Sequence, residues 1–372
     1  MQIIPDPLIL PETTLCGEGK AADILPAGLR FGVRGVLVHG RSLKESGALD
    51  RIRRAGPSAS AICAWQHGGG EPTLSQLDDL LTVTRQYRAD WIAGIGGGSV
   101  LDLAKAAAGL FHAAGSTVEY HDGRAIERPG IPFIAAPTTA GTGSEATINS
   151  VLTNTETHSK KSIRDPGLMA RLVILDPALL RTCPRSVVAH SGLDALTQAI
   201  EAYTSRYATW FSDTLALQAI SLLAANLQPA YDGHTGAEAA NLLQGSYLAG
   251  LALSHARLGV VHGLAHPLGA LYHVPHGQVC ALCLPHAIAL NRTAIGAKYA
   301  ALSAAIGADL LIQVEQWIGS FAIASPFAGQ PIRNSEAIIA ETLASGSTKS
   351  NPKPIARADV EWLLDRLFRK AE

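Results

Sequence analysis

The first half of this 372-residue chain alternates short apolar runs with segments of helical periodicity. Helical spacing is found at 44–54, 75–88 and 100–114, between apolar runs at 33–39, 61–65, 91–95 and 131–136. Strands that alternate with helices of about 10–15 residues are typical of a parallel sheet covered by helices. Two more strand-like runs follow at 147–153, where a hairpin fits, and at 172–175. The pattern predicts a parallel, doubly wound α/β domain.

Beyond Asp176 and Pro177 the pattern changes to successive helix-like segments with short breaks. We expect helices at 186–205, 212–230, 236–255, 262–272, 277–290, 296–306, 309–323 and 357–369. A chain of this length exceeds one typical hydrophobic core. The sequence therefore predicts an α/β dinucleotide-binding domain over 1–179 and an all-α domain over 180–372.

Composition and charge argue against several classes of partner. The net charge is −1 and no run of Lys and Arg is present, so neither nucleic acid nor a membrane surface is an expected partner. The N-terminus lacks a signal-peptide pattern, and no run of about 18 uncharged apolar residues predicts a spanning helix. The five scattered cysteines fit reduced thiols in a cytoplasmic protein, and we expect Cys280 and Cys283 to be buried core thiols.

Two polar loops follow predicted strands. Gly96, Gly97, Gly98 and Ser99 lie between a strand and a helix, where glycines let a phosphate approach the helix N-terminus. The alternative is a tight structural turn. The Ser/Thr/Gly loop 137–145 is suited to a nucleotide at the carboxyl end of the sheet. Asp102 and Lys105 lie farther along the glycine-led helix, where a solvated face is the alternative role.

Two pairs of polar residues lie one helical turn apart in the second half. Asp194 and Gln198 share one helix face, and His262 and His266 share another. The sequence HGLAH lacks the glutamate of the metalloprotease H-E-x-x-H motif. The stretch 254–285 also contains His255, His273 and His276. A single histidine is more often a structural imidazole than a ligand, so the pairs alone do not identify a metal site.

Taken together and in this order, the motifs resemble the iron-containing (group III) alcohol dehydrogenase family. The matching stretches are GGGSVLDLAKAAA (96–108), PTTAGTGSEAT (137–147), SGLDALTQAIEAY (191–203) and LGVVHGLAHPLGALYHVPHG (258–277). Related enzymes are glycerol dehydrogenase, maleylacetate reductase and dehydroquinate synthase. The resemblance implies the same architecture: an N-terminal dinucleotide-binding α/β domain and a helical C-terminal domain.

The resemblance also implies residue roles. Gly96, Gly97, Gly98 and Ser99 would hold the cofactor pyrophosphate, with Asp102 near the ribose or nicotinamide. Thr138 and Thr139 would lie near the adenosine half, Thr142 would belong to the same nucleotide loop, and either Lys160 or Lys161 would contact the cofactor. Asp194, His262 and His276 match three metal ligands. His266 matches a histidine beside the nicotinamide and substrate, whereas His255 and His273 are expected to be structural or secondary.

Gln198 departs from the family pattern, because iron-type members have a histidine ligand there. An amide oxygen is a weaker donor for Fe²⁺ or Zn²⁺ than imidazole, so Gln198 is a weak candidate for the fourth metal ligand. Three outcomes stay open: a three-ligand site, a weak and exchangeable metal, or a metal-free site of the maleylacetate reductase type. The tail 351–368 also resembles that branch.

Cofactor choice depends on the residue after the first dinucleotide strand. NAD-preferring relatives have an aspartate there, whereas this chain has Gly40 followed by Arg41. A guanidinium suits a 2′-phosphate, so NADP(H) is favoured over NAD(H). The alternative is a solvated Arg41.

The sequence thus predicts an NAD(P)H-dependent oxidoreductase that interconverts a small alcohol and its aldehyde or ketone in an interdomain cleft. Fe²⁺ or Zn²⁺ would polarise the substrate oxygen, with His266 or His276 in the proton path. The alternatives are a metal-independent reductase of an anionic substrate and a non-catalytic nucleotide-binding descendant. Family relatives are commonly dimers or larger, so a homodimer or larger homo-oligomer is expected.

Overall fold

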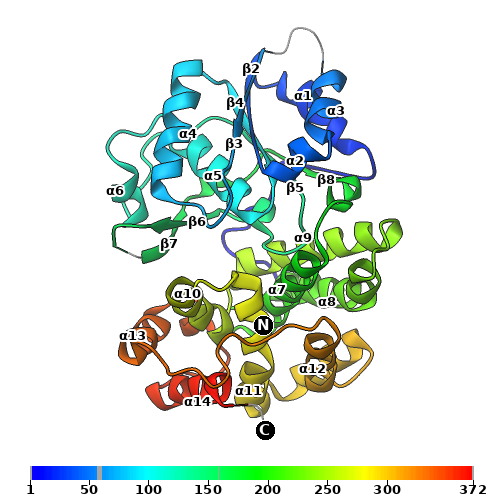
Figure 1. Ribbon diagram of the computed structural model, residues 1–372, viewed down its shortest axis with the longest axis vertical. Helices are drawn as coiled ribbons and strands as arrows, with labels where there is room; N and C mark the ends of the chain where they lie inside the picture. Colours follow the sequence, from blue (N-terminus) through cyan, green and yellow to red (C-terminus); the bar gives the residue numbers. More distant parts are fainter. Residues whose placement is uncertain (1, 57–60, 158, 371–372) are drawn as a thin grey trace. The chain divides into compact units, whose positions relative to one another are not determined.

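A computed structural model describes residues 2–56, 61–157 and 159–370. The chain divides into two compact units, coloured along the sequence in Figure 1. The α/β unit comprises Ile9–Pro184 and Thr235–Leu243. The helical unit comprises Met1–Leu8, Arg185–His234 and Gln244–Glu372.

The α/β unit is built on a six-stranded sheet in which every pair of neighbouring strands is parallel. Its strand order is β1-β8-β5-β4-β2-β3. In that order the bounds are Thr13–Cys16, Leu172–Leu175, Phe133–Pro137, Trp91–Gly96, Arg34–His39 and Ala61–Gln66. Strands β4 and β5 are buried along their whole length, as expected for a sheet covered on both faces. The predicted parallel α/β class is confirmed.

Helices connect these strands. They are α1 (Ile24–Gly28), α2 (Arg41–Glu45), α3 (Ala48–Ala55), α4 (Leu74–Tyr87), α5 (Gly98–Gly109) and α6 (Thr117–His121). The single helix expected at 44–54 is two helices, because Gly47 adopts φ 68° between them, in the left-handed region where glycine is favoured. Strands β6 (Asn149–Asn154) and β7 (Ser159–Arg164) form an antiparallel hairpin apart from the main sheet.

The helical unit contains no strand among its described residues. Its helices are α7 (Arg185–Thr204), α8 (Trp210–Tyr231), most of α9 (Ala237–Ala256), α10 (Val260–Tyr272), α11 (His276–Ile306), α12 (Leu310–Ser320), α13 (Ser335–Ala344) and α14 (Arg357–Phe368). The two helices expected at 277–290 and 296–306 form one element, α11, that is broken by non-helical backbone at Gly296.

Helix α11 is long and apolar enough to meet the length and composition test for a membrane span. More than half of its most apolar stretch is buried, so the helix serves as a core element of this unit.

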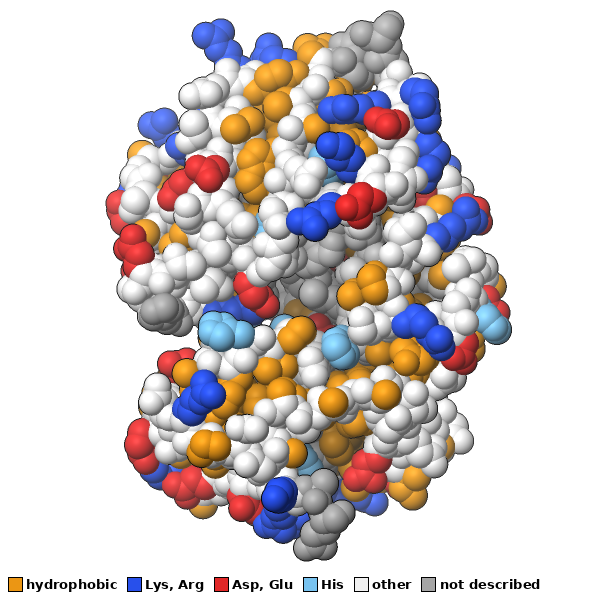
Figure 2. Space-filling view, in the orientation of Figure 1, with side chains coloured by type: hydrophobic (Ala, Val, Ile, Leu, Met, Phe, Trp, Pro, Cys, Tyr) orange, Lys and Arg blue, Asp and Glu red, His pale blue; other side chains and the backbone are white. Residues whose placement is uncertain are grey.

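On the face shown in Figure 2, the Lys and Arg side chains of the described residues are interspersed with Asp and Glu.

Candidate functional site

Helix α7 carries a buried polar stripe of Asp194, Gln198 and Glu201, spaced at i, i+4 and i+7. The Nε2 amide of Gln198 donates a hydrogen bond to Oδ2 of Asp194 at 3.1 Å. Oδ1 of Asp194 and Oε1 of Gln198 are buried and have no hydrogen-bond partner among the described residues. A buried oxygen without a donor is costly, which indicates that this stripe is built to meet a further group.

Helix α10 contributes His262, whose ring is fixed by Glu201. The two side chains share a hydrogen bond of 2.6 Å between Nδ1 of His262 and Oε2 of Glu201. The other oxygen of Glu201 accepts the backbone N–H of Val261 at 2.7 Å. With its Nδ1 proton directed at a carboxylate, a neutral His262 presents the lone pair of Nε2 to the cluster, the arrangement typical of metal-bound histidines. The sequence prediction missed Glu201, although its spacing from Gln198 continues the same helix face.

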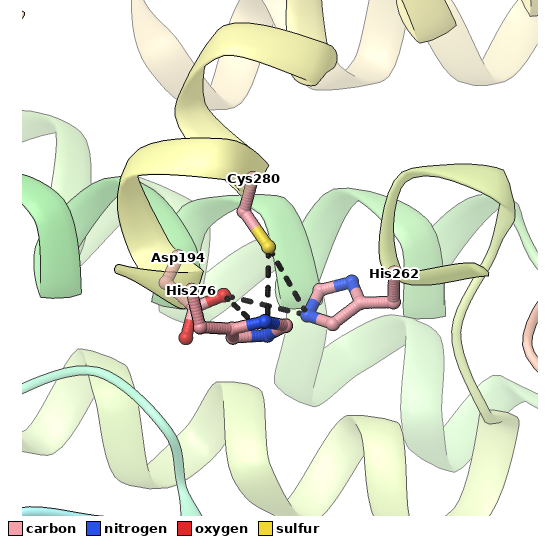
Figure 3. Close-up of side chains that lie close together, drawn as sticks. All are labelled: Asp194, His262, His276 and Cys280. Atoms are coloured by element: carbon pink, nitrogen blue, oxygen red, sulfur yellow. Dashed lines mark hydrogen bonds and ion pairs between the residues drawn. The ribbon is translucent and has the colours of Figure 1, made fainter. Parts of the chain in front are cut away.

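Helix α11 begins with His276 and places Cys280 one turn later. Sγ of Cys280 lies 3.5 Å from Nε2 of His276 and 3.9 Å from Nε2 of His262. A Cβ atom on Gly277 would lie only 2.4 Å from the carbonyl oxygen of His190, so glycine permits this close approach of α11 to α7. Figure 3 shows the resulting convergence of four side chains from three helices.

The four side chains Asp194, His262, His276 and Cys280 fit a divalent metal. One ligand atom from each lies within 4.8 Å of all the others. Oδ1 of Asp194 is 3.4 Å from Nε2 of His262 and 3.9 Å from Nε2 of His276. A tetrahedral zinc site with ordinary bond lengths has ligand–ligand separations of about 3.3–3.6 Å. The side chains thus surround a space of nearly the required size, and the site includes the three ligands that the resemblance implied.

The electrostatics of this cluster favour a positive charge. Burial by itself lowers the pKa of His262, but Cys280, Glu201 and Asp194 outweigh that effect and hold it well above the ordinary value. Burial raises the pKa of the Cys280 thiol to about 12. The carboxylates around His262 therefore suit a bound cation.

The remaining histidines of this stretch have separate roles. His266 is half-buried, with its ring centroid 5.3 Å from that of His276. His255 contacts the carbonyl of Leu251 through Nδ1 at 2.8 Å and packs edge-on against Phe211. His273 ends α10 in a left-handed conformation with φ 54°. The sequence pair His262 and His266 is therefore divided, with only His262 in the cluster.

In the α/β unit, the glycine turn and the Ser/Thr loop are in contact. Gly97 is the N-cap of α5, and a Cβ on Gly98 would lie 2.6 Å from Cγ2 of Thr142. Thr139 similarly lies against Gly97. The absence of side chains in the turn lets the threonine loop pack onto the α5 N-terminus, where backbone N–H groups suit a phosphate.

Asp102 and Lys105 do not form a solvated helix face. Lys105 is fully buried, and its Nζ donates to the carbonyls of Ser144, Thr147 and Asn149 at 2.6–3.0 Å. Asp102 accepts from the Ser144 hydroxyl at 2.6 Å and from the Val151 amide at 3.0 Å. The solvated alternative is wrong because the Ser/Thr loop and strand β6 cover this face of α5, and both residues hold those segments in place.

The two candidate lysines lie on β7 but point to different surroundings. Lys160 is largely buried and pairs with Glu71 at 2.7 Å. Burial raises the pKa of the Asp102 carboxyl, and Lys160 lies close enough to offset a small part of that rise. Lys161 is exposed and pairs with Asp122 at 2.6 Å. Of the two lysines, Lys160 is therefore the one that lies near Asp102. Arg41 is exposed and is the first residue of α2, directly after β2 and Gly40.

Comparisons with known proteins agree with this geometry. Residues 11–177 match the family "Iron-containing alcohol dehydrogenase", and residues 188–368 match "Fe-containing alcohol dehydrogenase family, C-terminal". The chain is 36% identical over 300 residues to the "Probable alcohol dehydrogenase EutG" of Salmonella typhimurium, covering 80% of this chain and 76% of that one. It is 34% identical over 310 residues to the lactaldehyde reductase of Escherichia coli K12, covering 81% and 79%.

A solved structure of a 1,3-propanediol oxidoreductase superposes with a TM-score of 0.88 at 30% identity, covering 99% of this chain and 100% of that one. These matches give no support to the features that resembled maleylacetate reductase. Both halves of the chain carry the family signature, and the fold is shared over its full length. The chain therefore belongs to the iron-containing alcohol dehydrogenase family.

Proposed function

We propose that this enzyme interconverts a small alcohol and its aldehyde or ketone with NADP(H) in preference to NAD(H), using a divalent metal held by Asp194, His262 and His276. The observation that carries the proposal is the convergence around one space of these three ligands, of which Asp194 and His262 are buried and His276 is half-buried. Membership of an NAD(P)-dependent alcohol dehydrogenase family gives the reaction type. A metal at this site supplies a Lewis acid that polarises the substrate oxygen.

The protein side chains divide the remaining work. Glu201 fixes the tautomer and direction of His262, and Gln198 holds Oδ2 of Asp194 so that Oδ1 faces the cluster. A ring nitrogen that binds a metal cannot also carry the substrate proton. His276 was predicted both as a ligand and as a proton carrier, so the proton role falls to its half-buried neighbour His266.

The nucleotide is assigned to the α/β unit. Gly96, Gly97, Gly98 and Ser99 would bind the pyrophosphate at the N-terminus of α5, beside the threonine loop with Thr138, Thr139 and Thr142. The position of Lys160 supports it over Lys161 as the cofactor-contacting lysine. Gly40 and the exposed Arg41 follow β2 at the carboxyl end of the sheet, where a 2′-phosphate would meet an exposed guanidinium.

The experiment is reduction of a panel of short aldehydes and ketones, followed by NADPH and NADH absorbance, with wild-type protein and Arg41→Ala. We expect turnover with at least one substrate and a KM for NADPH that rises about 10–100-fold in the variant, the worth of a hydrogen bond to a charged group. The KM for NADH should barely change. Equal effects on both cofactors would contradict the NADP(H) preference.

The same assay after chelation separates the metal-assisted reaction from a metal-independent one. We expect activity to fall on removal of metal and to return on its addition. Full activity in the chelated protein would contradict the assigned role of Asp194, His262 and His276. A cytoplasmic location and a homodimer or larger homo-oligomer stay predictions.

A further inference from the structure

Gln198 stands where the family pattern has a metal-binding histidine, and its amide nitrogen is engaged by Asp194, whereas Oε1 has no hydrogen-bond partner among the described residues. Nε2 donates to Oδ2 of Asp194, and turning the amide over would place Oε1 against the same carboxylate oxygen. Two acceptors facing each other in a buried site repel, so the observed orientation is the stable one. The side chain of Gln198 thus acts on Asp194, and a partner that fixes the direction of a ligand is a usual feature of metal sites.

Cys280 stands at the opposite side of the cluster and is fully buried. Its Sγ is 3.5 Å from Nε2 of His276 and 3.9 Å from Nε2 of His262. In a tetrahedral zinc site the separation between a thiolate sulfur and an imidazole nitrogen is about 3.5 Å. The second buried cysteine, Cys283, is three residues farther along α11 and does not belong to the cluster of ligand atoms. Two buried thiols on one helix therefore differ in their surroundings.

We propose that Cys280 binds the metal as a thiolate, so that Asp194, His262, His276 and Cys280 form the protein ligand set and Gln198 orients Asp194. The inference rests on the proposed metal-assisted function and concerns its ligand set. On binding, the sulfur–metal bond forms and the thiol proton leaves to solvent, because cysteine binds metals as the thiolate. The ligand lost at position 198 is thus replaced from another helix.

A sulfur ligand changes the metal that the site prefers. Thiolate donors select zinc and other thiophilic ions, whereas sites of oxygen and imidazole donors also hold Fe²⁺ and Mn²⁺ well. The Asp-His-His-Cys set therefore favours Zn²⁺ over Fe²⁺, although the family is named for iron. Co²⁺ occupies tetrahedral zinc sites and reports its ligands by absorption, so it is the appropriate probe.

The test is a titration of chelator-treated protein with Co²⁺, followed by absorption. Visible d–d bands report that Co²⁺ is bound, and an intense near-ultraviolet charge-transfer band reports a thiolate ligand. We expect both in wild-type protein, in Cys283→Ser and in Gln198→Leu. In Cys280→Ser the near-ultraviolet band should be lost. Circular dichroism and thermal unfolding of each variant check that it is folded.

Other outcomes overturn the inference. These are d–d bands without a near-ultraviolet band in wild-type protein, a band that persists in Cys280→Ser, or no Co²⁺ binding at all. The wild-type result alone is decisive if Cys280→Ser fails to fold. The proposed function is tested separately, by NADPH-dependent aldehyde reduction with the Zn²⁺-loaded protein. A thiolate band in a protein without such turnover would refute the function but keep the ligand set.

Discussion

Each unit of this protein buries a cluster of acidic side chains, and the two clusters differ in how that charge is compensated. In the α/β unit, Asp102 and Glu145 lie near Lys105, whose ammonium donates to backbone carbonyls and to a hydroxyl. In the helical unit, the ion pairs of Asp194 and Glu201 are formed with histidines. The first cluster contains the ammonium of a lysine, although burial lowers the pKa of Lys105 to about 8, whereas the second contains carboxylates, imidazoles and a thiol that can bind a metal cation.

The difference follows from what each cluster has to do. A buried carboxylate requires a partner charge, and an unpaired one costs several kcal/mol. The lysine in the α/β unit meets this requirement within the chain, so that cluster holds the Ser/Thr loop and the hairpin in a fixed arrangement. In the helical unit the corresponding groups are ligand atoms that converge on one space, which suits a metal ion. The following changes test this contrast, from the largest expected effect to the smallest.

Replacing Lys105 by Met should have the largest effect on stability. The change leaves the carbonyls of Ser144, Thr147 and Asn149 without their donor and removes the cation beside Asp102. Breaking a buried pair in this way costs about 3–5 kcal/mol, measured as the free energy of unfolding in urea. The control is Lys161→Met, which removes an exposed ion pair worth at most about 1 kcal/mol. Similar losses in both variants would contradict the structural role of Lys105.

Glu145 should make stability depend on pH. Burial raises the pKa of this carboxyl from 4.5 to about 7. Between these values the folded protein keeps a proton that the unfolded chain releases, so the free energy of unfolding falls as pH rises from about 4.5 to 7. The loss is about 3 kcal/mol at most, at about 1.4 kcal/mol per pKa unit.

The variant Glu145→Gln should lack this part of the pH dependence, because its amide does not titrate. The measurement is the difference between urea unfolding at pH 5 and at pH 7 in wild-type protein and the variant. The exposed Glu336→Gln serves as the control. If the free energy of unfolding changed equally between pH 5 and pH 7 in wild-type protein and in Glu145→Gln, burial would not raise the pKa of this carboxyl.

Glu201→Gln should weaken metal binding without abolishing it. The amide can still contact His262 but has no charge to hold its Nδ1 proton. Loss of such a supporting carboxylate typically lowers metal affinity 10–100-fold, which a competition titration of Zn²⁺ against a chelating dye measures. Glu315→Gln, at an exposed position on α12, should leave the affinity unchanged. An unchanged affinity in Glu201→Gln would mean that His262 is not the ligand that Glu201 orients.

The sequence predicted the parts of the fold that depend on local patterns. The apolar runs at 91–95 and 172–175 became β4 and β8, and helix periodicity placed Asp194 and Gln198 on one face of α7, where they are hydrogen-bonded. Strand β1 was not predicted, because its burial alternates between half-buried and exposed positions in a very short segment.

Burial and long-range neighbours were harder to predict. A solvated helix face was the alternative prediction for Lys105, because nothing in its local sequence shows that the Ser/Thr loop and β6 cover α5. Cys280 was correctly expected to be buried, but its neighbours come from α7 and α10, far away in the sequence. Its spacing of four residues from His276 was the available signal. That spacing becomes meaningful only when the glycine contact at Gly277 brings α11 onto α7.

The claim that the buried cluster of the helical unit binds a metal cation is tested most directly by thermal unfolding of chelator-treated protein with and without Zn²⁺. A ligand at 100 times its Kd stabilises the folded state by about 2.7 kcal/mol, and each kcal/mol raises Tm by about 2–4 °C in a unit of this size. We predict a rise of several degrees in wild-type protein and a much smaller one in Asp194→Asn. An unchanged Tm in wild-type protein, or an equal rise in both, would contradict the claim.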